Sequence, residues 1–162
     1  MTSDAWDALA KIFSPILIIS GWYVVVSNQS RQSRRKIIRD ELEILRTIVG
    51  ELGEAAIKFH TQSYNDELRR SIVGQLTLIS QRATLLPRIA RTGWMTWDAI
   101  PAKRIPDPGP CIIALRQAIT LHHFDDPAQL ALSGDSSEID AIEGARRDVL
   151  TSLDEMMIAA LD

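Results

Sequence analysis

Residues 38–59 read IRDELEILRTIVGELGEAAIKF, and this stretch decides the fold because its apolar residues recur at alternating spacings of four and three. Such spacing places one apolar side chain per turn on a single face of a helix. The face is widened by Ile37, Ile44, Ile48 and Ala55. The pattern predicts one long helix over residues 31–60, with buried positions at Ile38, Leu42, Leu45, Val49, Leu52, Ala56 and Phe59.

Three further helices are expected after this stretch. A second amphipathic helix covers residues 66–86, with Leu68, Ile72, Leu76, Ile79, Ala83 and Leu86 on one side, and Pro87 is expected to end it. Pro110 starts a short helix, CIIALRQAITLHHF, that stops before Asp125. The last helix covers residues 136–161, capped by Asp135 or Ser136, and its expected buried stripe is Ile139, Ile142, Val149, Leu153, Met156 and Ala160. The predicted fold class is therefore all-α.

Before the long helix, the eighteen residues from Leu9 to Val26 read LAKIFSPILIISGWYVVV and contain one charge, Lys11. Eighteen residues can cross a bilayer, and a lysine near one end can snorkel to the surface. Trp6 lies about 25 Å of helix from the Trp22 and Tyr23 pair, close to the thickness of a hydrocarbon core. The sequence predicts a single transmembrane helix in residues 1–30, the alternative being a buried helix of a soluble protein.

The charges beside this stretch predict its orientation. Acidic Asp4 and Asp7 precede it, whereas the residues that follow carry a basic cluster of Arg31, Arg34, Arg35, Lys36 and Arg39. Basic residues stay on the cytoplasmic side of a membrane. We therefore expect a bacterial inner-membrane protein with a periplasmic N-terminus and a cytoplasmic helical bundle over residues 31–162, and with the lipid bilayer as its first partner.

One face of the predicted span carries small residues at helical spacing. The face consists of Ala10, Ser14, Leu17 and Gly21, and all of these except Leu17 are small. Small residues let two helices approach closely within a membrane, so this face is a candidate oligomer or pore face. The apolar seam of residues 38–59 can equally face other helices of the same subunit or an identical neighbour. The sequence therefore favours a homo-oligomer.

The stretch over residues 87–110 is rich in proline and is expected to be a loop inside the bundle domain. It places Trp94 and Trp97 near Arg88 and Arg91. Two tryptophans among arginines suit a membrane interface, a stacked nucleic-acid base, or the covered end of the bundle. We treat these four residues as a candidate ligand or partner loop.

The usual signatures of most enzyme classes are missing from the sequence. It holds no glycine-rich phosphate loop, no paired metal-ligating histidines and no Ser-His-Asp set. Cys111 is the one cysteine, which excludes an intramolecular disulfide and a cysteine-rich metal cluster. We expect no cofactor, no bound metal and no enzymatic activity.

One short segment nevertheless has the residues for chemistry. Arg116 is followed by Gln117 and then by His122 and His123, a spacing that resembles the R-x4-6-H motif of HEPN domains. In ribonucleases of that superfamily the resemblance implies a histidine acting as general acid or base and an arginine stabilising the phosphorane charge. The alternative for this chain is structural, with Arg116 paired to an acid such as Asp125 and a histidine capping its helix.

The layout of the whole chain carries a second resemblance. A single N-terminal span, a basic flanking stretch, a helical domain and a late Arg-to-His segment resemble the small HEPN-like membrane accessory proteins of type VI-B CRISPR systems. That resemblance implies a homo-oligomeric anti-phage effector that perturbs the inner membrane, with a protein or RNA partner from a defence system. The alternatives are a membrane-tethered, metal-independent HEPN-type ribonuclease and a non-catalytic membrane scaffold.

Overall fold

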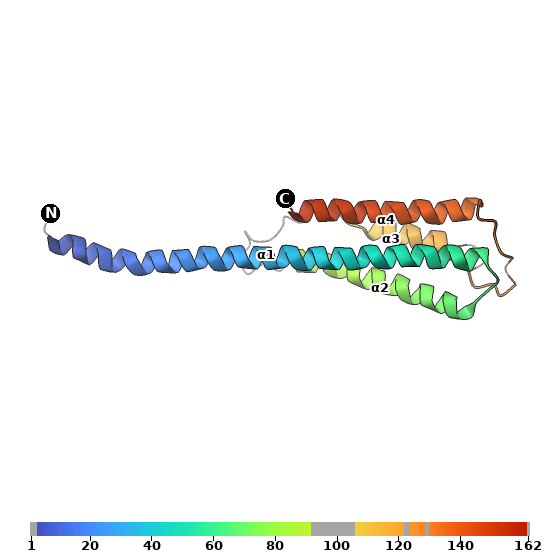
Figure 1. Ribbon diagram of the computed structural model, residues 1–162, viewed down its shortest axis with the longest axis horizontal. Helices are drawn as coiled ribbons and strands as arrows, with labels where there is room; N and C mark the ends of the chain where they lie inside the picture. Colours follow the sequence, from blue (N-terminus) through green and yellow to red (C-terminus); the bar gives the residue numbers. More distant parts are fainter. Residues whose placement is uncertain (1–2, 92–105, 122–123, 129, 162) are drawn as a thin grey trace. The chain divides into compact units, whose positions relative to one another are not determined.

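The computed structural model describes residues 3–91, 106–121, 124–128 and 130–161 of the 162-residue chain. Side chains are described for residues 17–18, 20–30, 32–33, 35–86, 106–121, 124–128 and 130–159. Within these ranges the regular elements are all α-helices, which confirms the predicted all-α class (Figure 1). The helices are α1 (Ser3–Thr61), α2 (Asp66–Arg91), α3 (Gly109–Thr120) and α4 (Ser137–Leu161).

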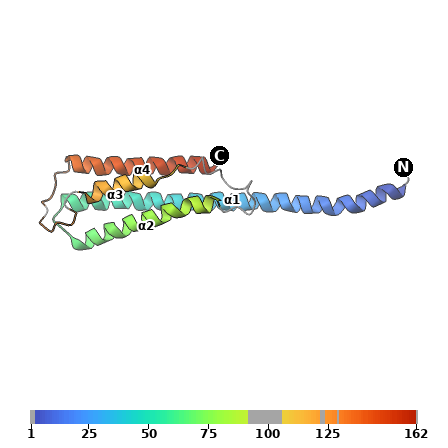
Figure 2. The same cartoon turned by 180° about the vertical axis from the view of Figure 1, so that it is seen from behind.

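The chain divides into two compact units, Met1–Lys36 and Ile37–Asp162. The first unit contains the α1 residues up to Lys36, and the second contains the rest of α1 with α2, α3 and α4. In the second unit these helices run alongside one another, as Figure 1 and the view from behind in Figure 2 both show. One core joins all four helices of this unit.

The long helix supplies the largest part of that core. All seven positions predicted from the four-three spacing are buried, with exposed fractions of 5% or less. Phe59 marks the end of this stripe, where its ring packs against Tyr64 and Phe124 with centroid distances of 5.8 and 5.0 Å. The periodicity predicted these positions correctly because helical spacing alone decides which side chains share a face.

α2 begins at a well-capped N-terminus and runs farther than predicted. The Asn65 side-chain oxygen accepts a hydrogen bond from the Leu68 backbone N–H at 3.0 Å, as expected of an N-cap asparagine. The predicted end at Pro87 is wrong, because the helix continues to Arg91. A proline removes one helical hydrogen bond and crowds the preceding turn, but it does not compel a helix to stop when neighbouring turns hold it.

α4 matches the sequence closely, whereas α3 ends at Thr120 and the predicted continuation to Phe124 is wrong. α3 begins beside Asp107, whose carboxylate accepts the Gly109 backbone N–H at 2.9 Å. α4 is capped by Ser136, whose hydroxyl accepts the Ile139 backbone N–H at 3.4 Å. Of the two predicted caps, Asp135 and Ser136, the structure uses Ser136. The predicted α4 stripe is buried at each position whose side chain is described.

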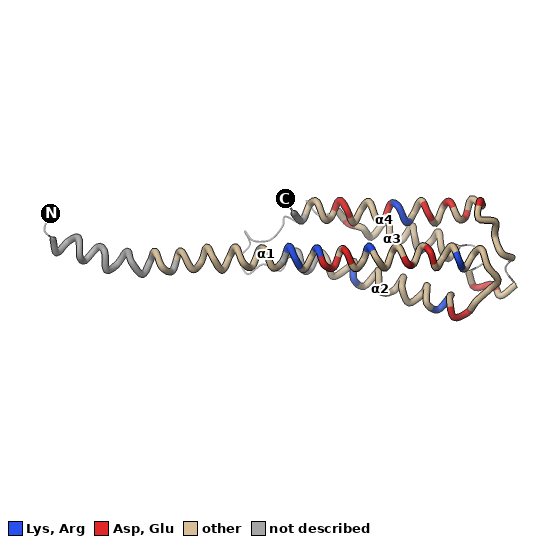
Figure 3. Tube along the Cα trace, in the orientation of Figure 1, with Lys and Arg blue, Asp and Glu red and all other residues tan. Residues whose placement is uncertain are grey.

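The acidic last helix is neutralised in part by the first helix. Asp154 of α4 pairs with Arg46 of α1 at 3.1 Å. A second ion pair, between Glu41 of α1 and Arg82 of α2, measures 2.7 Å. Figure 3 shows the acidic and basic residues distributed along the helices of this unit. These two ion pairs join α1 to the helices on either side of its apolar stripe.

Candidate functional site

The first unit exposes an unusual number of large apolar side chains. Their exposed fractions lie between 62% and 72% for Leu17, Ile18, Trp22, Val24 and Val25. At 100° per residue these five positions span an arc of about 160°, and the exposed Val26 and Tyr23 widen it to about 260°, so large apolar side chains cover most of the helix circumference. An α-helix that is apolar on all sides is usually buried in a protein core or a membrane. This stretch is therefore the main candidate site.

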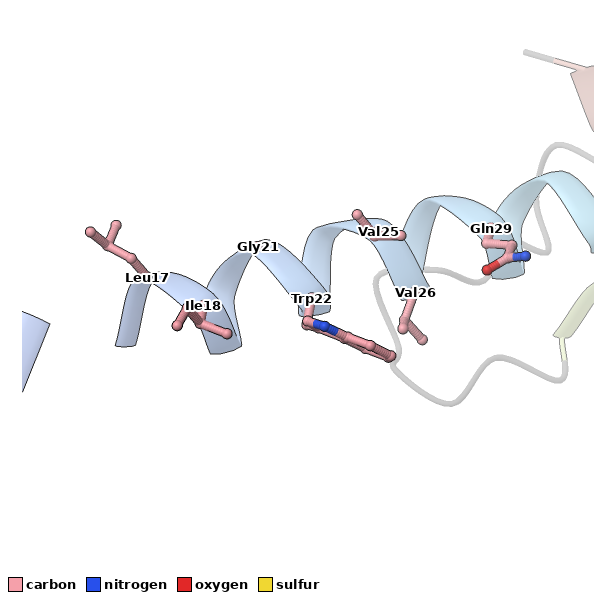
Figure 4. Close-up of a pocket in the computed structure, with 7 residues that line it drawn as sticks. All are labelled: Leu17, Ile18, Gly21, Trp22, Val25, Val26 and Gln29. Carbon is pink, nitrogen blue, oxygen red and sulfur yellow. The ribbon is translucent and has the colours of Figure 1, made fainter. Parts of the chain in front are cut away.

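A shallow apolar depression lies along one side of this stretch. Figure 4 shows it running from Leu17 and Ile18, past Gly21 and Trp22, to Gln29. Gly21 is one of the residues that line it, and apart from the adjacent helix backbone no described group lies within 4 Å of the position where a Cβ would stand. Leu17 and Gly21 belong to the predicted oligomer face, whereas the side chains of Ala10 and Ser14 lie outside the described residues.

The predicted interface residues are described only in part. Trp22 is largely exposed and Tyr23 partly so, and the side chain of Trp6 lies outside the described residues. In the basic cluster, the exposed Arg35 and Lys36 are described, and the side chains of Arg31 and Arg34 are not. In Figure 3 a stretch of α1 coloured as neither basic nor acidic precedes the first blue positions of that helix.

A search of the described residues for a membrane span gave a negative result. None of their helices combines the length and the apolar content needed to cross a bilayer.

Only the first part of the Arg-to-His segment is described by the structure. Arg116 lies on α3 with an exposed side chain, while His122 and His123 lie outside the described residues. Arg116 does not pair with Asp125 as the structural alternative proposed. That carboxylate instead accepts a hydrogen bond from Arg69 at 2.8 Å, because the turn after α3 lies beside the start of α2. The described part of the chain gives Arg116 no ion-pair partner.

The predicted loop over residues 87–110 is wrong in its first part, because residues 87–91 belong to α2, and residues 92–105 lie outside the described residues. Trp94 and Trp97 belong to residues 92–105, and the side chains of Arg88 and Arg91 at the end of α2 are not described. Their predicted role stays a prediction.

A buried histidine near the end of α1 was missed by the sequence interpretation. His60 is 3% exposed, and its Nε2 lies 3.0 Å from the carbonyl oxygen of Ile119 in α3. Its own carbonyl accepts the Leu132 backbone N–H at 2.8 Å. His60 therefore joins three separate segments of the chain. The available signal was its place one residue after Phe59, at the edge of the apolar stripe.

An ion-pair cluster surrounds the start of α2. The Asp66 carboxylate accepts a hydrogen bond from Arg69 at 3.1 Å and also pairs with Arg70. The hydrogen bond from Arg69 is the main cause that lowers the pKa of Asp66, with smaller contributions from both arginine charges. The same hydrogen bond raises the pKa of Arg69. The side chains of Asp66 and Arg69 are partly exposed, and through its ion pair with Asp125 Arg69 links the start of α2 to the segment after α3.

The described residues offer no group of three or more His, Cys, Asp or Glu side chains arranged to hold a metal ion. Fold and site together define an all-α protein whose first helix carries an exposed apolar stretch ahead of a helical bundle. Comparisons of this chain with known protein families, with curated proteins and with solved structures found no match.

Proposed function

We propose that the chain is a membrane-anchored helical protein that self-associates in the bilayer. In this proposal residues 9–26 of α1 cross the bacterial inner membrane, the N-terminus is periplasmic, and the bundle is cytoplasmic. The observation that carries it is the exposure of Leu17, Ile18, Trp22, Val24 and Val25. In water these side chains would leave an apolar surface uncovered, whereas lipid would cover them on every side.

The sequence around the exposed stretch supports the same proposal. Residues 9–16 extend it toward the N-terminus with one charged residue, Lys11. The exposed Arg35 and Lys36 follow it, and each cation near anionic lipid adds about 1 kcal/mol of attraction. Self-association is proposed through the face that contains Leu17 and Gly21, since the open space over Gly21 allows a second helix to approach closely.

Membrane integration is tested with one substitution and one matched control. Ile18→Arg places a charge in the middle of the proposed span and costs about 3 kcal/mol of insertion free energy. Ile113→Arg changes an equally exposed isoleucine of α3 in the bundle. We expect wild-type protein and the Ile113 variant to stay in the membrane pellet after alkaline carbonate, and the Ile18 variant to be released. Release of wild-type protein by a salt wash would contradict the anchor.

Action on the membrane is proposed from the resemblance to the HEPN-like accessory proteins. In this proposal the anchored oligomer perturbs the inner membrane during phage infection. Expression in a bacterial host is expected to depolarise the membrane, as read by a potential-sensitive dye, and Ile18→Arg should abolish the effect. A wild-type protein that integrates without changing the dye signal, with and without phage, would leave the anchor intact but remove the effector role.

The ribonuclease alternative is not favoured by any observation within the described residues, where Arg116 is its one described member.

A further inference from the structure

The outer surface between α1 and α2 carries four large aliphatic side chains outside the core. Their exposed fractions lie between 38% and 49%. We call them the α1–α2 patch, which consists of Ile37, Ile44, Leu78 and Leu85. All four belong to the second unit of the chain. The patch is therefore separate from the apolar stretch proposed as the anchor.

The Glu41–Arg82 ion pair shows how the patch is assembled. Its 2.7 Å contact places these two residues opposite each other across the helices. The two isoleucines of the patch stand four residues before and three after Glu41, and the two leucines stand likewise around Arg82. Residues three and four apart lie on one face of a helix. The ion pair is therefore flanked on both helices by aliphatic side chains.

Two polar atoms of the same surface lack a hydrogen-bond partner within the described residues. They are Nε of Arg82 and Oε1 of Gln75, and both are shielded from solvent. Gln75 stands seven residues before Arg82 on α2, so both side chains lie on the same side of that helix. Buried polar groups are normally paired, but this chain's own atoms already cover both, so a partner reaches them only if the side chains of Gln75 and Arg82 move.

We propose that a second copy of this chain packs on the α1–α2 patch, with the two copies related by a twofold axis. At a twofold interface the same surface meets itself. The centre of this surface holds one carboxylate and one guanidinium, so Glu41 of each copy can approach Arg82 of the other. The charges of the surface are thus self-complementary, and the aliphatic side chains of one copy cover those of the other.

Two other kinds of occupant fit this surface less well. A nucleic acid requires net positive charge to replace its counterions, and the Glu41–Arg82 pair is neutral. A lipid bilayer would remove water from that pair without supplying any partner in return. A second protein chain supplies both apolar area and hydrogen-bonding groups.

The patch covers residues 37–44 of α1, about 12 Å of helix at 1.5 Å per residue, and two packed helices present a face about 20 Å wide. Its area of roughly 240 Å² is part of the ~800 Å² that each partner contributes to a standard interface, so the rest of the outer surface of α1 and α2 must also take part in the contact. This proposal adds a cytoplasmic surface to the proposed self-association, and it does not require α1 to cross a bilayer.

The first test measures the mass of the full-length protein in detergent micelles by light scattering. Leu78→Glu puts a charge on the patch, and Ile113→Glu makes the same change at an exposed position of α3. We expect wild type and the Ile113 variant to be dimers or larger multiples. The Leu78 variant should become monomeric already at a protein concentration at least tenfold higher than the one at which wild type dissociates. Monomeric wild type, or an unchanged Leu78 variant, would overturn the proposal.

Cross-linking locates the contact independently of the anchor helix. In a Cys111→Ser background, Ile44→Cys is compared with Ile158→Cys, an exposed position of α4. A short bismaleimide is expected to yield a covalent dimer for the first variant only, and equal yields at the two positions would contradict the assignment. Carbonate extraction of Leu78→Glu should match wild type, which separates failure of this interface from failure of the proposed anchor.

Discussion

At the scale of single residues, His60 is the clearest structural position that the sequence analysis missed. Its ring is buried against Phe59, with ring centroids 5.4 Å apart, and hydrogen bonds to the Ile119 carbonyl. Removing one partner of a buried hydrogen bond typically costs about 1 to 3 kcal/mol. We expect His60→Ala to lower the free energy of unfolding by at least that amount, since the cavity adds to the loss.

Chemical denaturation followed by circular dichroism checks this value. Lys58→Ala, at an exposed position of the same helical turn, is the matched control and should change stability by less than about 0.5 kcal/mol. Equal stability of the two variants would show that the His60 contact contributes nothing.

Two glycines of α1 look alike in the sequence but differ in their surroundings. A Cβ on Gly53 would collide with the side chain of Arg146 from α4, whereas nothing lies within 4 Å of a Cβ on Gly50. Alanine favours a helix over glycine by about 1 kcal/mol, and crowding a packed site costs about 1 to 3 kcal/mol. We therefore expect Gly50→Ala to raise the thermal midpoint and Gly53→Ala to lower it.

The double variant Gly53→Ala with Arg146→Ala identifies the cause of that loss. Without the arginine side chain, the alanine at position 53 should recover part of the stability that alanine adds over glycine in a helix. If Gly53→Ala alone is as stable as Gly50→Ala, the close approach of Arg146 does not limit this position.

At the scale of elements, the start of α2 gives a prediction about pH. The pKa of Asp66 is lowered from 3.8, chiefly by its hydrogen bond from Arg69. A lowered folded-state pKa means that its contribution to stability is fully present above pH 4 and is lost as the pH falls through the folded value. The pKa of Arg69 is raised, so its contribution to stability is fully present below the ordinary pKa of arginine and is lost as the pH rises through the raised folded-state value.

Asp66→Asn is the variant that tests this linkage. We expect it to be less stable than wild type at pH 7, and the difference should shrink steadily below pH 4. Asp148→Asn, at an exposed position of α4, serves as the comparison. A stability difference that stays constant down to pH 2 would show that Asp66 ionisation is not linked to folding.

At the scale of the whole molecule, the proposed topology is open to a direct test in intact cells. A cysteine introduced as Thr2→Cys should react with a membrane-impermeant maleimide, because the acidic N-terminus is expected outside the cytoplasm. Cys111 should be shielded until the cells are permeabilised. Labelling of Cys111 in sealed cells would show that the orientation is opposite to the one proposed. In the control variant Thr2→Cys with Cys111→Ser, only the cysteine at the N-terminus can be labelled.

The sequence alone determined most of the core side chains that α1, α2 and α4 contribute. Every predicted position from Ile38 to Phe59 is buried, because the repeat of a helix is local and apolar residues at its spacing must share one face. The helix ends were predicted less accurately, as the continuation of α2 past Pro87 shows, because neighbouring helices can hold a turn that local propensity would break.

Only the tertiary structure decided which distant residues meet. Nothing in the spacing of Arg69, Arg116 and Asp125 shows that the carboxylate pairs with the first arginine and not the second. The burial of His60 and the exposure of Ile37 and Ile44 beside the core stripe were equally hidden. These outcomes depend on how the helices pack side by side, and that arrangement is fixed by the fit of all the side chains together.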